Sequence, residues 1–554
     1  MSQTPHWLLL SLVATALPAA DLFEDATAEA GLTFRHQSSK TPRKYLPETM
    51  SGGVAIFDAN QDGWMDVFFV NGAQLDFPHP QGKEPDKSDP RFWNRLFVNQ
   101  GDGTFKDQTE AFGLQGRGYG MGATVGDYDN DGFPDLLVTN AATGSAPGAV
   151  LYRNVEGKRF SDVTAAANLA TTGWATSAGF FDYDNDGFLD LFIARYMKYR
   201  FDVDFRCGME TSYGRTYCHP DLFEPETSYL FRNVGDGTFE DVSQASGIAD
   251  HPGKGLGVAF ADYDSDGWVD IAVANDSFPQ FLFHNLGDGT FEETALFAGT
   301  AYDEDGREFA GMGIAFEDLD SDGLPDIVAT ALSQEKYAFF HNAGNDAFEY
   351  RTEASGLGAT TQLYSGWGVN VFDFDNDGRR DLFFSNGHVM DNIAQSQPHL
   401  TYLQTPLLLR RDDEGFVNVS QQGGPTFQQD WAGRGSAVGD LDNDGDLDLV
   451  VSNVDGEAYL ARNLSDANWL GVRLVGCQSN RDGIGAQIEV SGAQVQRRQV
   501  TTAGSYLSSR DQRIFFGLSA VNEVDEIRVT WPGGSRTTRG RTQANQVVDV
   551  SECE

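Results

Sequence analysis

The sequence predicts an all-β fold: a seven-bladed β-propeller closed by its N-terminal strand, followed by a small C-terminal β-sandwich-like domain. Three observations support this prediction. An acidic nine-residue motif occurs seven times, each copy lies in a similar unit of short β-compatible segments, and the piece that the last unit lacks occurs near the N-terminus. Units of several short strands that repeat along a chain are typical of propellers and solenoids.

The motif has the form D-x-D-x-D-G-x-x-D and is clear in "DYDNDGFPD", which begins at Asp127. Carboxylates this close repel one another and resist desolvation unless a cation neutralises them. Oxygen ligands at positions 1, 3 and 5, a glycine at 6 and a backbone carbonyl at 7 match the first half of a calcium loop. Position 12, which is Glu in helical calcium loops, is Val138, so we expect Asp135 at position 9 to close the site.

Positions 1, 3, 5 and 9 of the seven copies predict up to seven calcium ions. Only Asn60 departs from Asp, and its amide oxygen can still coordinate. We expect most of these ions to be structural, whereas a Lewis-acid role for one of them would need an open coordination position. The predicted ligands are Asp58, Asn60, Asp62 and Asp66; Asp127, Asp129, Asp131 and Asp135; Asp182, Asp184, Asp186 and Asp190; Asp262, Asp264, Asp266 and Asp270; Asp318, Asp320, Asp322 and Asp326; Asp373, Asp375, Asp377 and Asp381; and Asp440, Asp442, Asp444 and Asp448.

Each copy lies in a unit of four expected strands. A glycine-spaced apolar strand precedes the motif, as in "GMGATVGDY" from Gly120, and a buried strand follows it. A third strand of the form "LFVNQGDGTF" ends in a hairpin turn whose Phe begins the fourth. The seventh unit lacks that fourth strand, and residues 21–34, "DLFEDATAEAGLTF", have the missing form. We therefore expect the N-terminal strand to complete blade seven of a propeller over residues 21–466.

A leader and a C-terminal domain flank the repeats. Residues 1–20 contain an apolar core followed by small residues, which predicts a signal peptide, although no Lys or Arg precedes the core. Low-affinity calcium modules suit calcium-rich surroundings, so the expected location is secreted, periplasmic or extracellular. Residues 467–554 contain short alternating strands that predict an antiparallel β domain. No other segment is long and apolar enough to span a membrane.

Charge and cysteine content narrow the class of protein further. The 39 basic and 82 acidic residues give a formal charge of -43, which excludes nucleic acid as the expected partner. The even number of cysteines in an exported chain suggests two disulfides, with Cys207–Cys218 and Cys477–Cys553 as the plausible pairs. A zinc site is disfavoured because His219 is the only nearby histidine and no C-x-x-C occurs.

The repeats resemble the FG-GAP or VCBS repeats of integrin-type propellers. The segments "NWLGVRLVGCQSNRDGIGAQIEV", "GSYLSSRDQRIFFGL" and "VTWPGGSRTT" resemble the ASPIC/UnbV domain. The combination is similar to the cartilage acidic protein-like family and covers nearly the whole chain after the leader. This resemblance implies the fold and the calcium loops, but it does not fix a reaction, because one fold hosts many functions.

The face opposite the calcium loops is where we expect a ligand, because its loops differ most between blades. Aromatic, cationic and amide side chains of these loops are predicted to converge at the channel mouth and bind an extracellular glycan, protein or small molecule. The alternative is that the aromatic side chains plug the channel. The predicted ligand-binding residues are Tyr119, Trp174, Arg195, Asn275, Asp276, Trp367, Asn386, Trp431 and Arg434.

The sequence is compatible with two classes of function, recognition and catalysis. The favoured one is an exported calcium-binding protein of recognition or adhesion, because seven similar metal loops occur without a nucleophile motif. The alternative is a calcium-stabilised lyase, isomerase, cyclase or hydrolase at the channel mouth. In that case Glu48, Glu308 or His388 would act as acid or base, and a cation such as Lys254 would stabilise developing charge. The sequence does not indicate an oligomeric state.

Overall fold

The computed structural model describes residues 21–142, 146–208 and 214–553, so the predicted signal peptide lies outside the described residues. The described chain consists of β-strands with a few short helices, which confirms the all-β prediction. The α-helices are α1 (Pro47–Met50), α2 (Thr109–Phe112), α3 (Ala295–Ala298), α4 (Leu357–Thr361) and α5 (Ile393–Ser396), and the 3-10 helices are η1 (Pro90–Phe92), η2 (Pro220–Leu222), η3 (Ile248–Asp250), η4 (Ser420–Gln422), η5 (Pro425–Gln428) and η6 (Pro532–Gly534).

Seven four-stranded sheets follow the seven copies of the acidic motif, and the motif joins the first strand of each sheet to the second. We number these sheets blades 1 to 7. From the innermost to the outermost strand they are β2 (Val54–Phe57), β3 (Asp66–Phe69), β4 (Arg95–Asn99), β5 (Phe105–Asp107); β6 (Gly120–Gly126), β7 (Asp135–Asn140), β8 (Ala149–Asn154), β9 (Phe160–Asp162); β10 (Ala175–Phe181), β11 (Asp190–Arg195), β13 (Tyr229–Asn233), β14 (Phe239–Asp241); β16 (Gly255–Ala261), β17 (Asp270–Asn275), β18 (Phe281–Asn285), β19 (Phe291–Glu293); β20 (Ile314–Glu317), β21 (Asp326–Ala329), β22 (Ala338–Asn342), β23 (Phe348–Tyr350); β24 (Gly366–Phe372), β25 (Asp381–Asn386), β26 (Leu407–Arg411), β27 (Phe416–Asn418); and β28 (Gly433–Gly439), β29 (Asp448–Asn453), β30 (Tyr459–Asn463), β1 (Phe23–Asp25).

The innermost strands form a ring around a central channel. Neighbouring innermost strands contact each other from β2 to β28, and β28 contacts β2 in turn. The N-terminal strand β1 pairs antiparallel with β30, with Phe23 opposite Asn463, and is the outermost strand of blade 7. The buried ring of Phe23 packs against Phe374 and Phe427, with centroids 6.2 and 5.3 Å away. This apolar contact packs the N-terminal strand of blade 7 against the acidic loop of blade 6 and against η5.

The C-terminal domain contains two sheets. In one, β31 (Asn468–Val475) lies between β34 (Ile514–Ser519) and β39 (Val547–Ser551); in the other, the strand order is β33 (Val495–Gln499), β32 (Gln487–Ser491), β36 (Glu526–Thr530) and β37 (Arg536–Arg539). The pairs β12 (Glu226–Thr227)–β15 (Pro252–Gly253) and β35 (Glu523–Val524)–β38 (Thr542–Gln543) are short ribbons.

The pairing inside this domain departs from the prediction in one place. Strands β31 and β39 run parallel, so the expectation of a purely antiparallel domain was wrong. The chain reaches β39 only after crossing the second sheet, which lets it return beside β31 in the same direction. Both predicted disulfides are present, Cys207–Cys218 in the insertion of blade 3 and Cys477–Cys553 in this domain.

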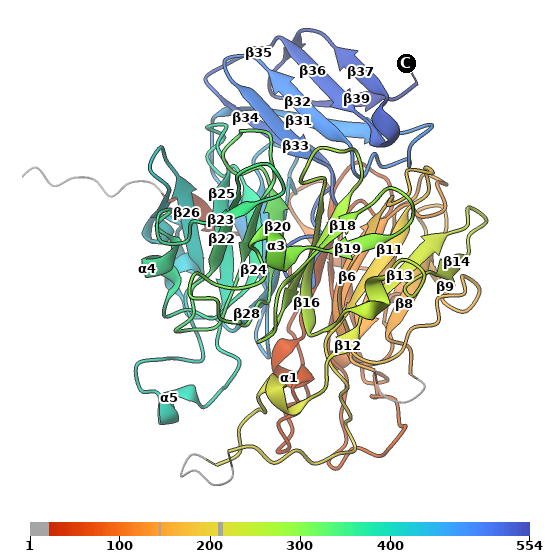
Figure 1. Ribbon diagram of the computed structural model, residues 1–554, viewed down its shortest axis with the longest axis vertical. Helices are drawn as coiled ribbons and strands as arrows, with labels where there is room; N and C mark the ends of the chain where they lie inside the picture. Colours follow the sequence, from red (N-terminus) through yellow and green to blue (C-terminus); the bar gives the residue numbers. More distant parts are fainter. Residues whose placement is uncertain (1–20, 143–145, 209–213, 554) are drawn as a thin grey trace, which may run out of the picture.

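Between β33 and β34, residues 501–512 leave the C-terminal domain and enter the propeller channel. We call them the plug segment. Ser505 bridges Ile314 of blade 5, and Ser509 bridges Ala55 of blade 1. The inner strands need glycine where the plug passes, because a Cβ on Gly53 would lie 2.2 Å from the carbonyl oxygen of Leu507. Figure 1 shows the C-terminal domain at one end of the propeller, with α1, α5 and β12 at the other.

Candidate functional site

The acidic loops bring their carboxylates together by folding the backbone around the first Asp. In blade 2, ligand atoms of Asp127, Asp129 and Asp135 lie within 4.8 Å of one another. The N–H groups of Asp131 and Gly132 donate to the two carboxylate oxygens of Asp127, at 3.0 and 2.7 Å. Gly132 has a φ of +90°, where a side chain would be strained, so position 6 requires glycine. The repeat thus encodes a preformed acidic cradle.

The electrostatics of the loops fit a bound cation. Burial raises the pKa of Asp66 and Asp326 to about 8. Burial, which is the larger cause, and the charge of Asp482, which is the second, together raise the pKa of Asp127 to about 8. Crowded and desolvated carboxylates of this kind are suited to a hard divalent cation with oxygen ligands. Among the described residues, the loop carboxylates with a buried oxygen that lacks a hydrogen-bond partner are those of Asp184, Asp375, Asp440 and Asp442.

Blades 4 and 5 add a histidine that the sequence analysis missed. His284 Nδ1 lies 3.2 Å from Asp270 Oδ1, and His341 Nδ1 lies 3.0 Å from Asp326 Oδ1. The signal was present in the third strands, where "LFHN" and "FFHN" replace the Arg or Val of other copies. The hydrogen bond that His284 donates to Asp270 raises the pKa of the histidine to about 9. These two loops therefore differ chemically from the other five.

The loops are tied to one another around the ring. The residue at position 4 has a positive backbone φ in all seven copies. In five copies its side chain donates a hydrogen bond to the acidic loop of the next blade. Blades 4 and 5 have Ser265 and Ser321 there, which are too short for this link. The five linking pairs are Gln61–Gly132, Asn130–Gly187, Asn185–Gly267, Asn376–Asp446 and Asn443–Gly63.

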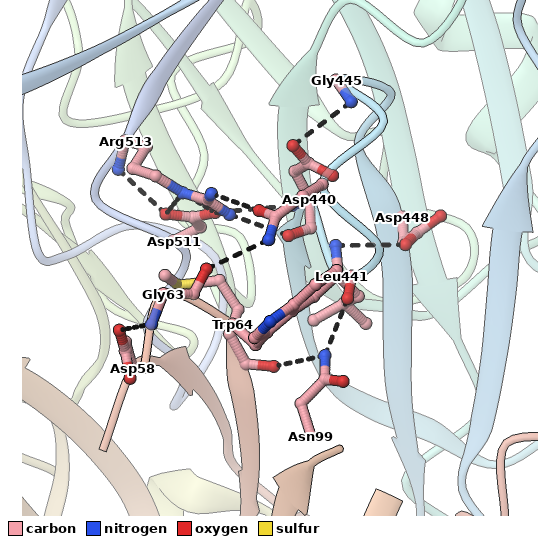
Figure 2. A network of polar contacts seen from close by, with 12 residues as sticks. Asp58, Gly63, Trp64, Asn99, Asp440, Leu441, Gly445, Asp448, Asp511 and Arg513 are labelled. Carbon is pink, nitrogen blue, oxygen red and sulfur yellow. Dashed lines mark hydrogen bonds and ion pairs between the residues drawn. The ribbon is translucent and has the colours of Figure 1, made fainter. Parts of the chain in front are cut away.

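An asparagine at the end of the third strand forms a second link between blades. In blade 1, the N–H of Asn99 donates to Asp66 at 2.8 Å. Its side-chain amide donates to the carbonyl oxygens of Met65 and of Leu441 in blade 7, at 3.1 and 2.7 Å (Figure 2). Six blades have this asparagine, whereas blade 6 has Arg411. A repeated Asn that looked like part of a hairpin in the sequence is thus an inter-blade staple.

The C-terminal domain rests on this loop face. Asp482 accepts a hydrogen bond from the N–H of Asp127, the first residue of the blade 2 loop, at 2.9 Å. At blade 7, Arg513 pairs with Asp511 at 2.7 Å and donates to the carbonyl oxygen of Asp440 and to Asn443 Oδ1, both at 2.7 Å (Figure 2). Two loops are therefore held directly by side chains of the second domain.

The predicted ligand residues lie at the opposite end of the channel, where almost all of them are buried. Of the nine, eight are buried and Trp431 is partly buried. Insertions between the blades cover this face, so the side chains contact one another instead of solvent. The structure has the alternative arrangement, in which aromatics fill the channel. The buried ones are Tyr119, Trp174, Arg195, Asn275, Asp276, Trp367, Asn386 and Arg434.

The contacts of Trp367 and Arg434 show how polar groups at the centre find partners, although the buried Trp174 Nε1 has none among the described residues. Trp367 donates to the carbonyl oxygen of Gly387 at 2.6 Å, and the Arg434 guanidinium lies 4.0 Å from the centre of its ring. Arg434 also donates to the carbonyl oxygen of Thr49 at 2.6 Å. Tyr506, at the tip of the plug segment, packs on Trp367 and donates to the carbonyl oxygen of Met50 at 2.8 Å. Sequence reasoning missed the plug because its partners lie hundreds of residues away.

The four candidate catalytic residues do not pair with one another in the described chain, and three of them have other partners. Glu48 accepts from the N–H and hydroxyl of Thr41, and burial raises its pKa to about 8. His388 Nδ1 accepts from the N–H of Met390 at 2.9 Å, while Lys254 lies 3.6 Å from Asp221. Glu308 is exposed. Within the described residues, no hydrogen bond or ion pair joins any two of these four side chains, so they do not form one acid–base site.

A serine and a histidine also meet beside the channel. His36 Nε2 lies 3.0 Å from Ser51 Oγ, and both residues are fully buried. The Ser51 hydroxyl donates to the carbonyl oxygen of Gly120 at 2.7 Å, and His36 Nδ1 accepts from the backbone N–H of Asp455 at 3.4 Å. A nucleophilic triad needs the serine to donate to the histidine and a carboxylate to accept from it. The observed pattern is the reverse, which is that of a structural pair.

Comparisons with known proteins agree with the repeat pattern. The FG-GAP-like repeat family matches residues 58–138, 141–193, 219–273, 262–329 and 318–384, and the ASPIC and UnbV family matches residues 476–554. Cartilage acidic protein 1 of Homo sapiens is 26% identical over 531 residues, which cover 91% of this chain and 72% of that protein. The Mus musculus protein is also 26% identical, over 91% of this chain and 74% of its own length.

Similarity to solved structures is weaker. The BP39L lectin from Burkholderia pseudomallei has a TM-score of 0.43 at 10% identity, covering 76% of this chain and 98% of that one. An Agrocybe aegerita lectin that recognises non-reducing terminal N-acetylglucosamine has a TM-score of 0.37 at 15% identity, covering 74% and 87%. Scores this low say nothing about function here. The family matches, which span more than half of the sequence, show that this chain belongs to the FG-GAP-like repeat proteins and carries a C-terminal ASPIC and UnbV domain.

Proposed function

We propose that this chain is an exported, calcium-stabilised recognition protein that binds an extracellular protein or glycan through the face opposite its acidic loops. One observation carries this proposal. The loop face is repetitive and is occupied by the C-terminal domain, whereas the opposite face is built from insertions that differ from blade to blade and cover a closed aromatic centre (Figure 1). Variable segments on a rigid ring are the usual carriers of specific binding.

Four insertions make up this surface, which we call the insertion face: the described residues 35–50, 71–94, 196–208 with 214–227, and 388–404. Charged pairs tie the first, third and fourth of them together. Arg43 lies 3.6 Å from Asp204, and Lys44 forms an ion pair with Asp391. The Cys207–Cys218 disulfide braces the third insertion. Loops held in this way lose little entropy on binding, which favours recognition by a preorganised surface.

The exposed residues of this end of the molecule suit a macromolecular partner. Phe77 is 56% exposed and the guanidinium of Arg43 lies 5.8 Å from its ring, while Leu222 is 61% exposed on η2. Exposed apolar and aromatic groups next to arginine are typical of protein interfaces and of sugar-binding surfaces. We infer that the ligand contacts these side chains and leaves the buried tryptophans beneath them undisturbed.

In this proposal each acidic loop holds one calcium ion through positions 1, 3, 5 and 9 and the carbonyl at position 7. The orphaned carboxylate oxygens and raised pKa values support a cation at these loops. A bound ion would cross-link the first two strands of its blade and so add to folding stability. The two disulfides support an oxidising location outside the cytosol. None of the helices in the described ranges has the length and apolarity to cross a membrane.

Binding to an array of glycans and extracellular proteins, in calcium, tests the proposal. Any ligand found should bind at least tenfold more weakly to the double variant Phe77→Glu, Leu222→Glu. The matched control is Phe297→Glu, since Phe297 is 90% exposed on α3 at the outside of blade 4. Equal affinity of the double variant and wild type would place the ligand elsewhere. Failure to bind any member of such an array would contradict the recognition role.

A further inference from the structure

The boundary between blades 5 and 6 departs from the repeat more than any other. Glu317 precedes the blade 5 loop, where the other loops follow Phe, Gly or Ala. Arg380 occupies position 8 of the blade 6 loop, where the other six copies have Met, Pro, Leu or Val. Ser321 and Arg411 replace the two linking side chains described above. Four departures at one boundary indicate that the residues there have a role that the other repeats do not share.

Two of these departures, Glu317 and Arg380, line a cavity under the C-terminal domain. Because neither linking amide is present, the loops of blades 5 and 6 are not joined as the other neighbours are. Strand β33 lies over the gap, and a cavity remains between the two domains. Among the residues that line it are Glu317, Arg380, Gln487, Arg498, Gln499 and Thr501.

Among the described residues, the ion pairs around this cavity leave one buried guanidinium without a carboxylate partner. Arg497, which also lines the cavity, pairs with Glu489 at 2.8 Å. Arg510 lies 2.7 Å and Arg380 2.9 Å from Glu317. Burial alone would raise the pKa of Glu317, but Arg510 and Arg380 hold it below its ordinary value. One carboxylate thus already serves two guanidinium groups. A third guanidinium group beside Glu317 therefore needs a different anion as its partner.

Arg498 is that third cation. It is 2% exposed, and burial, followed by the charge of Arg380, lowers its pKa to about 9. Its Nη atoms donate to the carbonyl oxygen of Arg497 at 2.8 Å and to Gln496 Oε1 at 3.1 Å. Its Nε has no hydrogen-bond partner, and neither has that of Arg380. In the described part of the chain Arg498 forms no ion pair, and a buried charge without a partner is costly.

The nearest loop carboxylates are already engaged. Both oxygens of Asp318 accept from N–H groups of their own loop, at Ser321 and Gly323. Both oxygens of Asp373 do the same with Asp377 and Gly378. As first residues of acidic loops, these two groups face their own cradles. They lower the cost of burying Arg498 but leave its Nε–H unsatisfied.

We propose that this cavity is an anion site, in which a small oxyanion binds between Arg380 and Arg498 and bridges the propeller to the C-terminal domain. Guanidinium groups bind planar or tetrahedral oxyanions through paired N–H donors, and Gln487, Gln499 and Thr501 offer further donors in the lining. The ligand class is inorganic sulfate or phosphate, or a carboxylate. This inference is independent of the ligand proposed for the insertion face.

Sulfate binding to the calcium-loaded full-length protein tests the proposal. Calorimetric titration with sulfate, acetate and chloride at constant ionic strength separates an oxyanion, a carboxylate and a general salt effect. We expect saturable sulfate or acetate binding by wild type that is weakened at least tenfold by Arg380→Leu. That variant restores the apolar residue of the repeat, as at Leu189, and keeps the Glu317–Arg510 pair, so it is expected to fold.

The matched control is Arg528→Gln. Arg528 lies on β36 of the same sheet and does not line the cavity; its side chain is 42% exposed and pairs with Glu489 at 2.8 Å. It should bind the anion like wild type, whereas Arg498→Gln should not, and Arg498→Lys should retain partial affinity. Selenate located by anomalous scattering in crystals should lie between Arg380 and Arg498. Equal binding by wild type and Arg380→Leu, or no binding by wild type, would overturn the proposal.

Discussion

The acidic-loop face and the insertion face are opposite ends of the same strands, yet they are held together by different means. On the loop face, repeated side chains such as Asn99 connect each blade to its neighbour, and the same bond recurs around most of the ring. On the insertion face, contacts such as Arg43–Asp204 occur once. The difference teaches that the repeat preserves the acidic cradle and the ring, while the other end is free to diverge.

Removal of calcium should produce the largest effect and should act on the loop face. Each filled site adds about 2.7 kcal/mol when calcium is at 100 times the Kd, and the metal-free loops retain their carboxylate repulsion. Calorimetric melting with calcium and then with chelator should therefore show a fall in Tm of more than ~10 °C for a chain of this size. An unchanged Tm would show that the loops fold without a cation.

The plug segment connects the two faces, so Tyr506→Ala should destabilise both. Tyr506 is fully buried against Trp367, and loss of a buried aromatic ring costs about 3–5 kcal/mol. Tyr506→Phe, the control, loses only the hydrogen bond to Met50, worth about 1 kcal/mol. Denaturant unfolding in calcium measures both. Equal stability of the Ala and Phe variants would mean that the ring does not hold the channel closed.

Asp511→Asn tests how the second domain is held on the loop face. The change removes the charge partner of Arg513, which is 9% exposed, and should cost about 3 kcal/mol. We expect the C-terminal domain to become sensitive to limited proteolysis in calcium. Arg473, which pairs with Asp549 on the exposed side of the same domain, provides the control, since Asp549→Asn should change stability by under ~1 kcal/mol. Equal proteolysis of the two variants would contradict this role.

Glu48 offers a smaller, pH-dependent test on the insertion side. Its pKa is raised to about 8 in the folded protein, so the folded state keeps a proton that the unfolded chain releases near pH 4.5. Stability should therefore fall as pH rises from about 4.5 to 8. Glu48→Gln cannot ionise and should lose this part of the dependence, gaining on the order of 1 kcal/mol at pH 8. Parallel pH profiles of Tm for wild type and variant, in calcium, would refute the assignment.

The fold was predictable because its signals are local and repeated. The motif, its glycine and the N-terminal piece of blade 7 all lie in short segments whose chemistry does not depend on distant residues, and both disulfides could be paired by position. The insertion face was misjudged because burial depends on what covers a residue. Trp174 and Trp367 have the composition of a ligand site, yet the insertions and Tyr506 enclose them. The unpaired Arg498 could not be predicted either, because its burial depends on the propeller loops that cover it.

The most direct test of the loop face is the number of calcium ions that the purified protein holds. Native mass spectrometry at saturating free calcium, compared with a chelated sample, counts them without reference to activity. The seven cradles predict close to seven ions, with one ion lost in a variant such as Asp135→Ala, which removes the closing ligand of blade 2. A calcium-free mass at saturating calcium, or an unchanged count in that variant, would contradict the account.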